Sequence, residues 1–112
     1  MNQTAPLAFE GRTVLVTGAG RGMGREHARL FASLGAQVVV ADAGVDLFGS
    51  GSDEGVAEAV ARELCDAGWR ASAYSADLAS EEGARGAVLH TVERFGRIDA
   101  VVHNAGFTLG SM

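Results

Sequence analysis

The sequence of 112 residues contains no lysine, one cysteine and one proline. Because the single Cys65 has no intrachain partner, a disulfide framework is excluded and a reducing, cytoplasmic compartment is expected. We interpret Cys65 as a small apolar filler on a helix. Sixteen glycines beside one proline indicate tight helix exits and loops, and argue against an extended polyproline linker.

Long apolar runs and excess positive charge are also missing. No run approaches the roughly 20 residues of a membrane helix. The first residues, MNQTAPLAFEGR, lack the basic and apolar regions of a signal peptide. Nine basic residues, all arginine, stand against fourteen acidic ones, so the net charge of −5 disfavours nucleic acid and anionic membranes as partners. With 47% hydrophobic residues, the composition predicts one soluble domain over residues 1–112.

Short apolar runs alternate with segments of helical period. Strands are expected at residues 13–17, 37–41, 70–74 and 98–102. Helices are expected at residues 23–34, 53–67 and 81–95, with C-caps at Gly35, Gly68 and Gly96 and N-caps at Ser80 and at Asp53 or Ser52. Strands that alternate with helical crossovers predict an α/β fold, with a parallel sheet covered by helices on both faces. The third strand, which is rich in small residues, is expected at an edge.

The stretch TGAGRGMG, residues 17–24, lies between the first strand and the first helix. Helix N-termini carry unpaired N–H groups that attract phosphate, and glycines let a pyrophosphate approach the backbone. The alternative is a glycine-rich turn without a ligand. The spacing fits T-G-x-x-x-G-x-G, and no Gly-Lys-Ser/Thr follows, which disfavours a nucleotide triphosphatase.

Asp42 ends the second strand, 24 positions after Gly18. A carboxylate there accepts hydrogen bonds from the adenosine ribose hydroxyls and repels a 2′-phosphate, which favours NAD over NADP. Arg21 favours NADP instead, because a guanidinium pairs well with a 2′-phosphate. Asp42 as a local cap is the structural alternative. The long stretch 43–52 either borders the ligand or is a surface insertion.

Four pieces now resemble the short-chain dehydrogenase/reductase family: TGAGRGMG at 17–24, Asp42, ADL at 76–78 and HNAG at 103–106. They occur in the family's order and cover essentially the whole chain. The resemblance implies a Rossmann-type, doubly wound parallel sheet, present in part, with about four strands in the order 3-2-1-4. Since the fourth strand would then have an open edge, we expect pairing with a second copy or with a missing half.

The resemblance also implies the cofactor-binding residues. They are Gly18, Arg21, Gly22 and Met23 around the pyrophosphate and its ribose, Asp42 at the adenosine ribose, Asp77 and the Leu78 amide at the adenine edge, and Asn104, Ala105 and Gly106 after the fourth strand. Asn104 would brace the sheet. His103 stands where the family more often has asparagine, and we interpret it as structural and not as a catalytic base.

The activity implied is hydride transfer between NAD, or less favourably NADP, and an alcohol or ketone. The stretch 43–52 resembles enzymes acting on hydroxyacyl thioesters or hydroxysteroids. The family's catalytic Ser and Tyr-x-x-x-Lys would lie beyond residue 112, so the chain is expected to be truncated and inactive alone, with Tyr74 a packing residue. A non-catalytic dinucleotide-binding module and an assembly fragment remain alternatives. Three scattered histidines predict no metal site.

Overall fold

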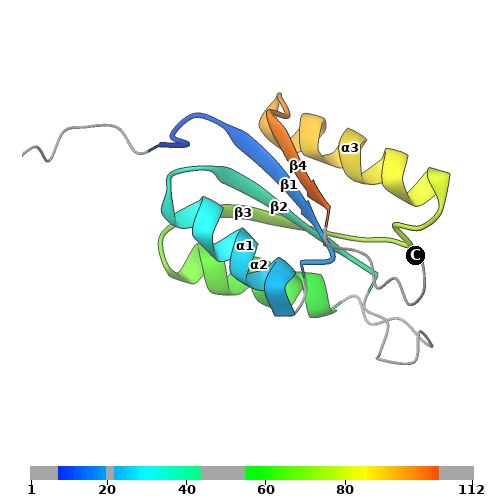
Figure 1. Cartoon of the computed structure of the whole chain (residues 1–112), viewed down its shortest axis with the longest axis horizontal. Coiled ribbons are helices and arrows are strands. Elements are labelled where there is room, and N and C mark those ends of the chain that lie inside the picture. The colour runs from blue at the N-terminus through cyan, green and yellow to red at the C-terminus, as the bar shows by residue number, and fades with distance from the viewer. Residues whose placement is uncertain (1–7, 20–21, 44–54, 104–112) are drawn as a thin grey trace, which may run out of the picture.

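The computed structural model describes residues 8–19, 22–43 and 55–103 (Figure 1). Strands and helices alternate throughout, as the sequence predicts. The elements are β1 (Thr13–Thr17), α1 (Gly22–Ser33), β2 (Gln37–Asp42), α2 (Gly55–Asp66), β3 (Arg70–Ser75), α3 (Glu81–Phe95) and β4 (Ala100–His103).

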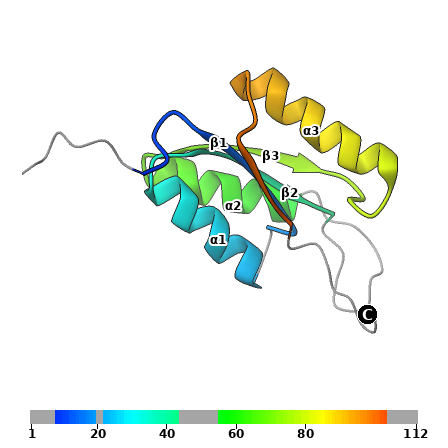
Figure 2. The same ribbon diagram turned by 45° about the horizontal axis from the view of Figure 1, so that its top comes forward.

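The strands form one parallel sheet in the order β3-β2-β1-β4. Helices α1 and α2 cover one face and α3 covers the other, which is clearest when the two views are compared (Figures 1 and 2). The predicted Rossmann-type α/β fold, its strand order and the edge position of β3 are confirmed. Among the described residues, β4 pairs with β1 alone.

The core lies on both faces of the central strands, because successive side chains of a strand alternate between them. Even-numbered residues of β1 and β2, such as Val14 and Val38, pack under α1 and α2 together with the fully buried Leu64. Odd-numbered residues, such as Leu15 and Val39, pack under α3. Both strands are therefore almost fully buried, which explains their continuous apolar sequences.

The helix ends follow the predicted capping residues. Gly35, Gly68 and Gly96 all have positive φ, and the N–H of Gly96 donates to the carbonyl of Val92 at 2.7 Å. The Ser80 hydroxyl accepts from the N–H of Gly83 at 2.9 Å, which confirms Ser80 as the N-cap of α3. Ser52 and Asp53 lie outside the described residues.

Two predictions about local structure were wrong. Cys65 is exposed on α2, and its thiol donates to the carbonyl of Ala71 at 3.4 Å, so it is not a core filler. The last strand begins at Ala100 and not at residue 98. Ile98 packs into the core before the strand starts, and Asp99 is used to anchor the strand.

Asp99 fastens the start of β4 to the start of β1. Its Oδ2 accepts from the N–H of Thr13 at 2.8 Å, and its own N–H donates to the carbonyl of Thr13 at 2.8 Å. The Arg97 guanidinium donates to both carboxylate oxygens, at 2.9 and 2.7 Å. The hydrogen bond from Arg97 lowers the pKa of Asp99. The hydrogen bond from the Thr13 N–H and the positive charges of Arg97 and Arg12 lower this pKa further, whereas desolvation raises it.

The D99N substitution should therefore reduce stability at neutral pH and reduce it less in acid. A carboxyl whose pKa is lower in the folded state stabilises the fold above its ordinary pKa near 3.8, and this contribution is lost as pH falls through the folded value. Urea unfolding at neutral pH and at about pH 3 measures the difference between the two proteins. A difference that is the same at both pH values would contradict this role.

No helix within the described ranges is both long and apolar enough to cross a bilayer.

Candidate functional site

The four parallel strands end at one edge of the sheet, and this carboxyl edge holds the candidate site (Figure 1). From β1 the chain passes through α1 to β2 on one side, and it later passes through α3 to β4 on the other side. The direction of winding therefore reverses between β1 and β4. Ligands of open parallel sheets bind at such a reversal, beyond the carboxyl ends of the strands.

The glycine loop starts directly after β1 and is fixed to the neighbouring strand. Gly18 has φ +67°, and the N–H of the buried Ala19 donates to the carbonyl of Ala41 at 3.2 Å. This bond ties the loop to the end of β2. Residue Arg21, predicted to contact the pyrophosphate or a 2′-phosphate, lies outside the described residues.

Two glycines at the start of α1 give the loop a packed side and an open side. Gly24 is buried, and a Cβ added there would overlap the carbonyl oxygen of Gly18, so only glycine allows this approach of helix to loop. Gly22 has φ +64°, and an added Cβ would meet nothing within 4 Å. The described residues therefore leave the Cβ side of Gly22 open, at the helix end whose unpaired N–H groups attract phosphate.

An ion pair between helices holds the first turn of α1 in position. The Arg25 guanidinium donates to the two carboxylate oxygens of Glu63 on α2, at 2.7 and 2.9 Å from Nη2. Met23, by contrast, is 71% exposed and projects away from the core. The start of α1 is thus fixed by packing at Gly24 and by charge at Arg25, while its outer surface stays accessible.

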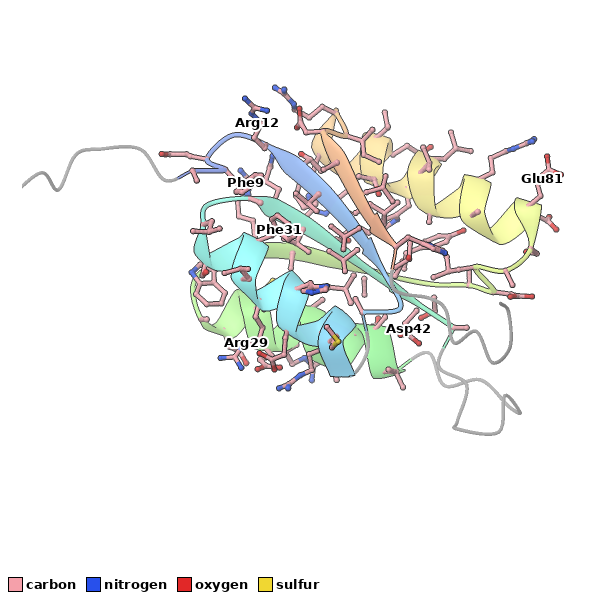
Figure 3. The ribbon with its side chains drawn as sticks, viewed as in Figure 1. Phe9, Arg12, Arg29, Phe31, Asp42 and Glu81 are labelled. Atoms are coloured by element: carbon pink, nitrogen blue, oxygen red, sulfur yellow. The ribbon has the colours of Figure 1, made fainter. Side chains whose placement is uncertain are left out.

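Asp42 is the last residue of β2 and is only 9% exposed. Alternation along the strand places its side chain on the face that carries α1 and α2, and Figure 3 shows it at the carboxyl edge. Its backbone carbonyl accepts from the N–H of Ala76 at 3.3 Å, which secures the strand end. A carboxylate therefore lies on the same side of the sheet as α1, at the edge where the glycine loop begins.

Asp77 and Leu78 shape the turn between β3 and α3. The Asp77 Oδ1 atom accepts from the N–H of Ala79 at 3.0 Å, and its carbonyl accepts from the Ser80 hydroxyl at 2.9 Å. Leu78 packs into the core under α3. The contact of Asp77 and the Leu78 amide with an adenine edge stays a prediction. The predicted residues Asn104, Ala105 and Gly106 lie outside the described residues.

The carboxyl ends of β1 and β4 are joined by a side-chain contact that the sequence analysis missed. Thr17 Oγ1 lies 2.9 Å from His103 Nδ1, and the two residues are opposite each other in the β1–β4 register. His103 was interpreted as structural without a partner. The signal was present in the sequence, because each residue sits at the start of one of the two motifs that flank the reversal of winding.

Tyr74 is used in packing, as predicted. Its ring centroid lies 5.1 Å from that of His90, and its hydroxyl lies against Gly86 on α3. The Ser72 hydroxyl is 3.0 Å from His90 Nε2. Burial lowers the pKa of His90, the positive charge of Arg94 lowers it further, and Glu93 partly offsets both.

Within the part of the chain that the structure describes, no group of three or more histidine, cysteine or carboxylate residues is arranged to hold a metal ion. The site therefore consists of backbone amides, one buried carboxylate and a threonine–histidine pair.

Comparisons with known proteins agree with the fold. Residues 12–112 match the family described as short chain dehydrogenase. The mouse peroxisomal multifunctional enzyme type 2 is 45% identical over 102 residues, which cover 91% of this chain and 14% of that protein. The crystal structure of a short chain dehydrogenase from Mycobacterium avium is 46% identical with a TM-score of 0.78, covering 88% of this chain and 34% of that one.

A hydroxysteroid dehydrogenase from Escherichia coli has the same TM-score of 0.78 at 32% identity, covering 88% of this chain and 38% of the other. The chain thus spans well under half the length of each of these relatives. The family match covers residues 12–112, and it is consistent with the glycine loop and with the reversal of winding between β1 and β4. The chain therefore belongs to the short-chain dehydrogenase family of oxidoreductases.

Proposed function

We propose that this chain is the dinucleotide-binding domain of an NAD-dependent short-chain dehydrogenase acting on an alcohol or ketone. The observation that carries the proposal is the glycine loop, packed at Gly24 and open at Gly22, beside the buried Asp42. When bound, the nicotinamide cofactor supplies the hydride acceptor or donor. The chain's own part is to hold the pyrophosphate and the adenosine ribose.

The loop residues would bind the pyrophosphate through backbone N–H groups. Gly18 and Gly22 bring the backbone close, and the first turn of α1 offers unpaired donors with partial positive charge. Arg21, Met23, Asp77, Leu78 and the segment 104–106 complete the proposed contacts, by resemblance to the family. Room beside Gly22 and the close packing at Gly24 support this assignment.

Preference for NAD is proposed from Asp42. A carboxylate that is 9% exposed is poorly screened by water, so a 2′-phosphate placed against it would be repelled strongly. The ribose hydroxyls of NAD would instead donate to it. NADP is the less favoured cofactor.

The substrate proposed is a hydroxyacyl thioester or a hydroxysteroid. The similar structure named a hydroxysteroid dehydrogenase supports the second of these two classes. We further propose a cytoplasmic location and association through the open edge of β4, as a homo-oligomer or with further chain. The mouse relative is named as peroxisomal.

Calorimetric titration of the protein with NAD, NADH and NADPH tests the cofactor role. We expect NAD and NADH to bind, and NADPH to bind at least about tenfold more weakly, which corresponds to about 1.4 kcal/mol. A folded protein that binds none of the three nucleotides at millimolar concentration would overturn the proposal.

The same preparation is expected to show no turnover with a panel of secondary alcohols. The chain contains no lysine, and its single tyrosine is held against α3. A Tyr-Lys pair is therefore not available within these 112 residues for proton transfer. Measurable turnover would contradict the reasoning about catalysis while leaving cofactor binding intact.

A further inference from the structure

The described part of the molecule leaves several large hydrophobic side chains exposed. They are Met23, Leu30, Val88, Leu89, Val92 and Val101. Apart from Leu89, they lie on the side of the molecule where β4 forms an edge of the sheet, as the contacts of α1, α3 and β4 show below. We call these five residues and that edge the β4-side surface. Contiguous apolar surface of this kind is typical of a site of protein contact.

Helix α1 turns an apolar flank toward β4. Arg25 reaches Glu63 on α2, and α2 packs on β2 and β3 while α1 packs on β1 and β2. Residues three and four apart share a side of a helix, so Met23, His27 and Leu30 form the flank that faces away from α2 and toward β4. On this flank the Nδ1 atom of His27 is buried and, within the described ranges, lacks a hydrogen-bond partner.

Helix α3 presents a similar flank on the other face of the sheet. His90 faces β3, because its Nε2 atom lies 3.0 Å from the Ser72 hydroxyl, and Thr91 is buried against the sheet. Each residue advances about 100° around a helix, so Val92 lies on the side away from β3 and therefore toward β4. Val88 lies one turn before it on the same side.

Strand β4 is covered on one face only. Ala100 and Val102 pack with the core under α1 and α2. Val101 lies on the α3 face and is 54% exposed, because α3 packs mainly on β1, β2 and β3. An open apolar corner therefore remains between α3 and β4.

The winding of the chain indicates what fits this corner. The steps from β1 to β2 and from β2 to β3 pass through helices on one face, and the step back from β3 to β4 passes through α3 on the other (Figure 2). Crossovers between parallel strands are right-handed in nearly all proteins. A further step outward from β4 would therefore place its helix on the α3 face, over the open corner.

A second copy of the chain fits the surface poorly. Strands lie about 4.8 Å apart, so joining two β4 edges would leave the two α1 helices, each over β1 and β2, about 20 Å apart. Helices in contact lie about 8–10 Å apart. The two α1 flanks would then face a gap about one helix wide, and the α3 helices, which also reach β3, would be further apart.

We propose that the β4-side surface binds a further strand–helix unit supplied by the remainder of a short-chain dehydrogenase domain. Its strand pairs with β4, one apolar helix fills the α3 corner, and a second lies on the α1 flank and bonds to His27 Nδ1. The chain covers only 34% of the similar Mycobacterium avium dehydrogenase, so that protein contains enough further chain for such a unit. The inference rests on the association proposed above and names the partner.

The test fuses residues 1–112 to the part of the Mycobacterium avium dehydrogenase that follows its matched region, and compares the fusion with the chain alone. Val101→Glu should lower the melting temperature of the fusion by about 8 °C, because the charge would be buried. In the chain alone the shift should stay under about 3 °C, because Val101 is exposed there. Leu30→Glu should show the same contrast on the α1 flank.

Ala67→Glu is the matched control. It adds the same charge at an exposed position just after α2, on the far side from β4, and should shift the fusion and the chain alone equally.

Sedimentation of the chain alone identifies the competing partner. A defined dimer that Val101→Glu dissociates would show that a second copy covers the surface and would overturn the inference. So would a fusion that does not fold, or a Val101→Glu shift that is equal in the fusion and in the chain alone. NADH titration of the chain tests the cofactor role separately, so either proposal can fail while the other stands.

Discussion

Replacing Gly24 by alanine should both destabilise the protein and abolish tight dinucleotide binding. The added Cβ would overlap the carbonyl oxygen of Gly18 and approach the Cα of Ala19 at 3.0 Å. These are backbone atoms in a loop that is hydrogen-bonded to β2, so moving them away from the added Cβ would cost free energy. Overpacking of this kind lowers the unfolding free energy by about 3 kcal/mol, or about 15 °C in melting temperature for a domain of this size.

Displacing the loop from the helix should also weaken NADH binding by at least about tenfold, because the amide donors lose their shared geometry. Thermal unfolding and calorimetric titration measure the two effects. Gly68→Ala is the matched control, since Gly68 has φ +93° and open space around it. That change should cost about 1 kcal/mol through backbone strain alone and leave affinity unaltered.

If Gly24→Ala melts and binds like wild type, the close contact between helix and loop is not a requirement of the fold. If it loses stability but keeps full affinity, the loop does not hold the pyrophosphate. The two measurements therefore separate a packing role from a binding role.

Asp42→Ala should weaken NAD binding by about 30-fold, the loss of roughly 2 kcal/mol expected when hydrogen bonds to a charged group are removed. NADP binding should improve relative to NAD, because the repulsion of the 2′-phosphate disappears. The ratio of the two dissociation constants, measured by titration, reports this change without requiring catalysis.

Two variants accompany that measurement. Asp42→Asn removes the charge and keeps acceptor capacity, so it should relieve the repulsion of NADP while retaining part of the NAD affinity. Asp66→Ala removes one negative charge at an exposed position at the end of α2 and should change neither affinity nor preference. An unchanged preference in Asp42→Ala would remove Asp42 from the ribose site.

The arrangement of elements was predictable because each signal is local. Apolar runs such as 37–41 are buried on both faces, and a glycine follows each helix where the backbone turns left-handed. The position of Asp42 at the end of β2 follows from counting along one strand. These features depend on neighbours within a few residues, so the sequence displays them directly.

Features that depend on distant partners were missed or misplaced. β4 starts later than predicted because Asp99 forms hydrogen bonds with Thr13, 86 positions away in the sequence. The partner of His103 is Thr17, and this pairing depends on the register of β1 with β4, which brings the starts of two distant motifs together. Cys65 has an apolar character that suggests burial, yet the helix turns it outward.

The place of β1 has a consequence for synthesis on the ribosome. This strand precedes the other three described strands in the chain, is fully apolar in its middle, and pairs with both β2 and β4. Its bond with Asp99 closes a loop of 86 positions, so its pairing with β4 waits until residues 99–103 have emerged. Nascent chains stalled before β4 has left the exit tunnel should therefore expose the unpaired edge of β1, which chaperones recognise, and chaperone binding should end once residues 100–103 have emerged.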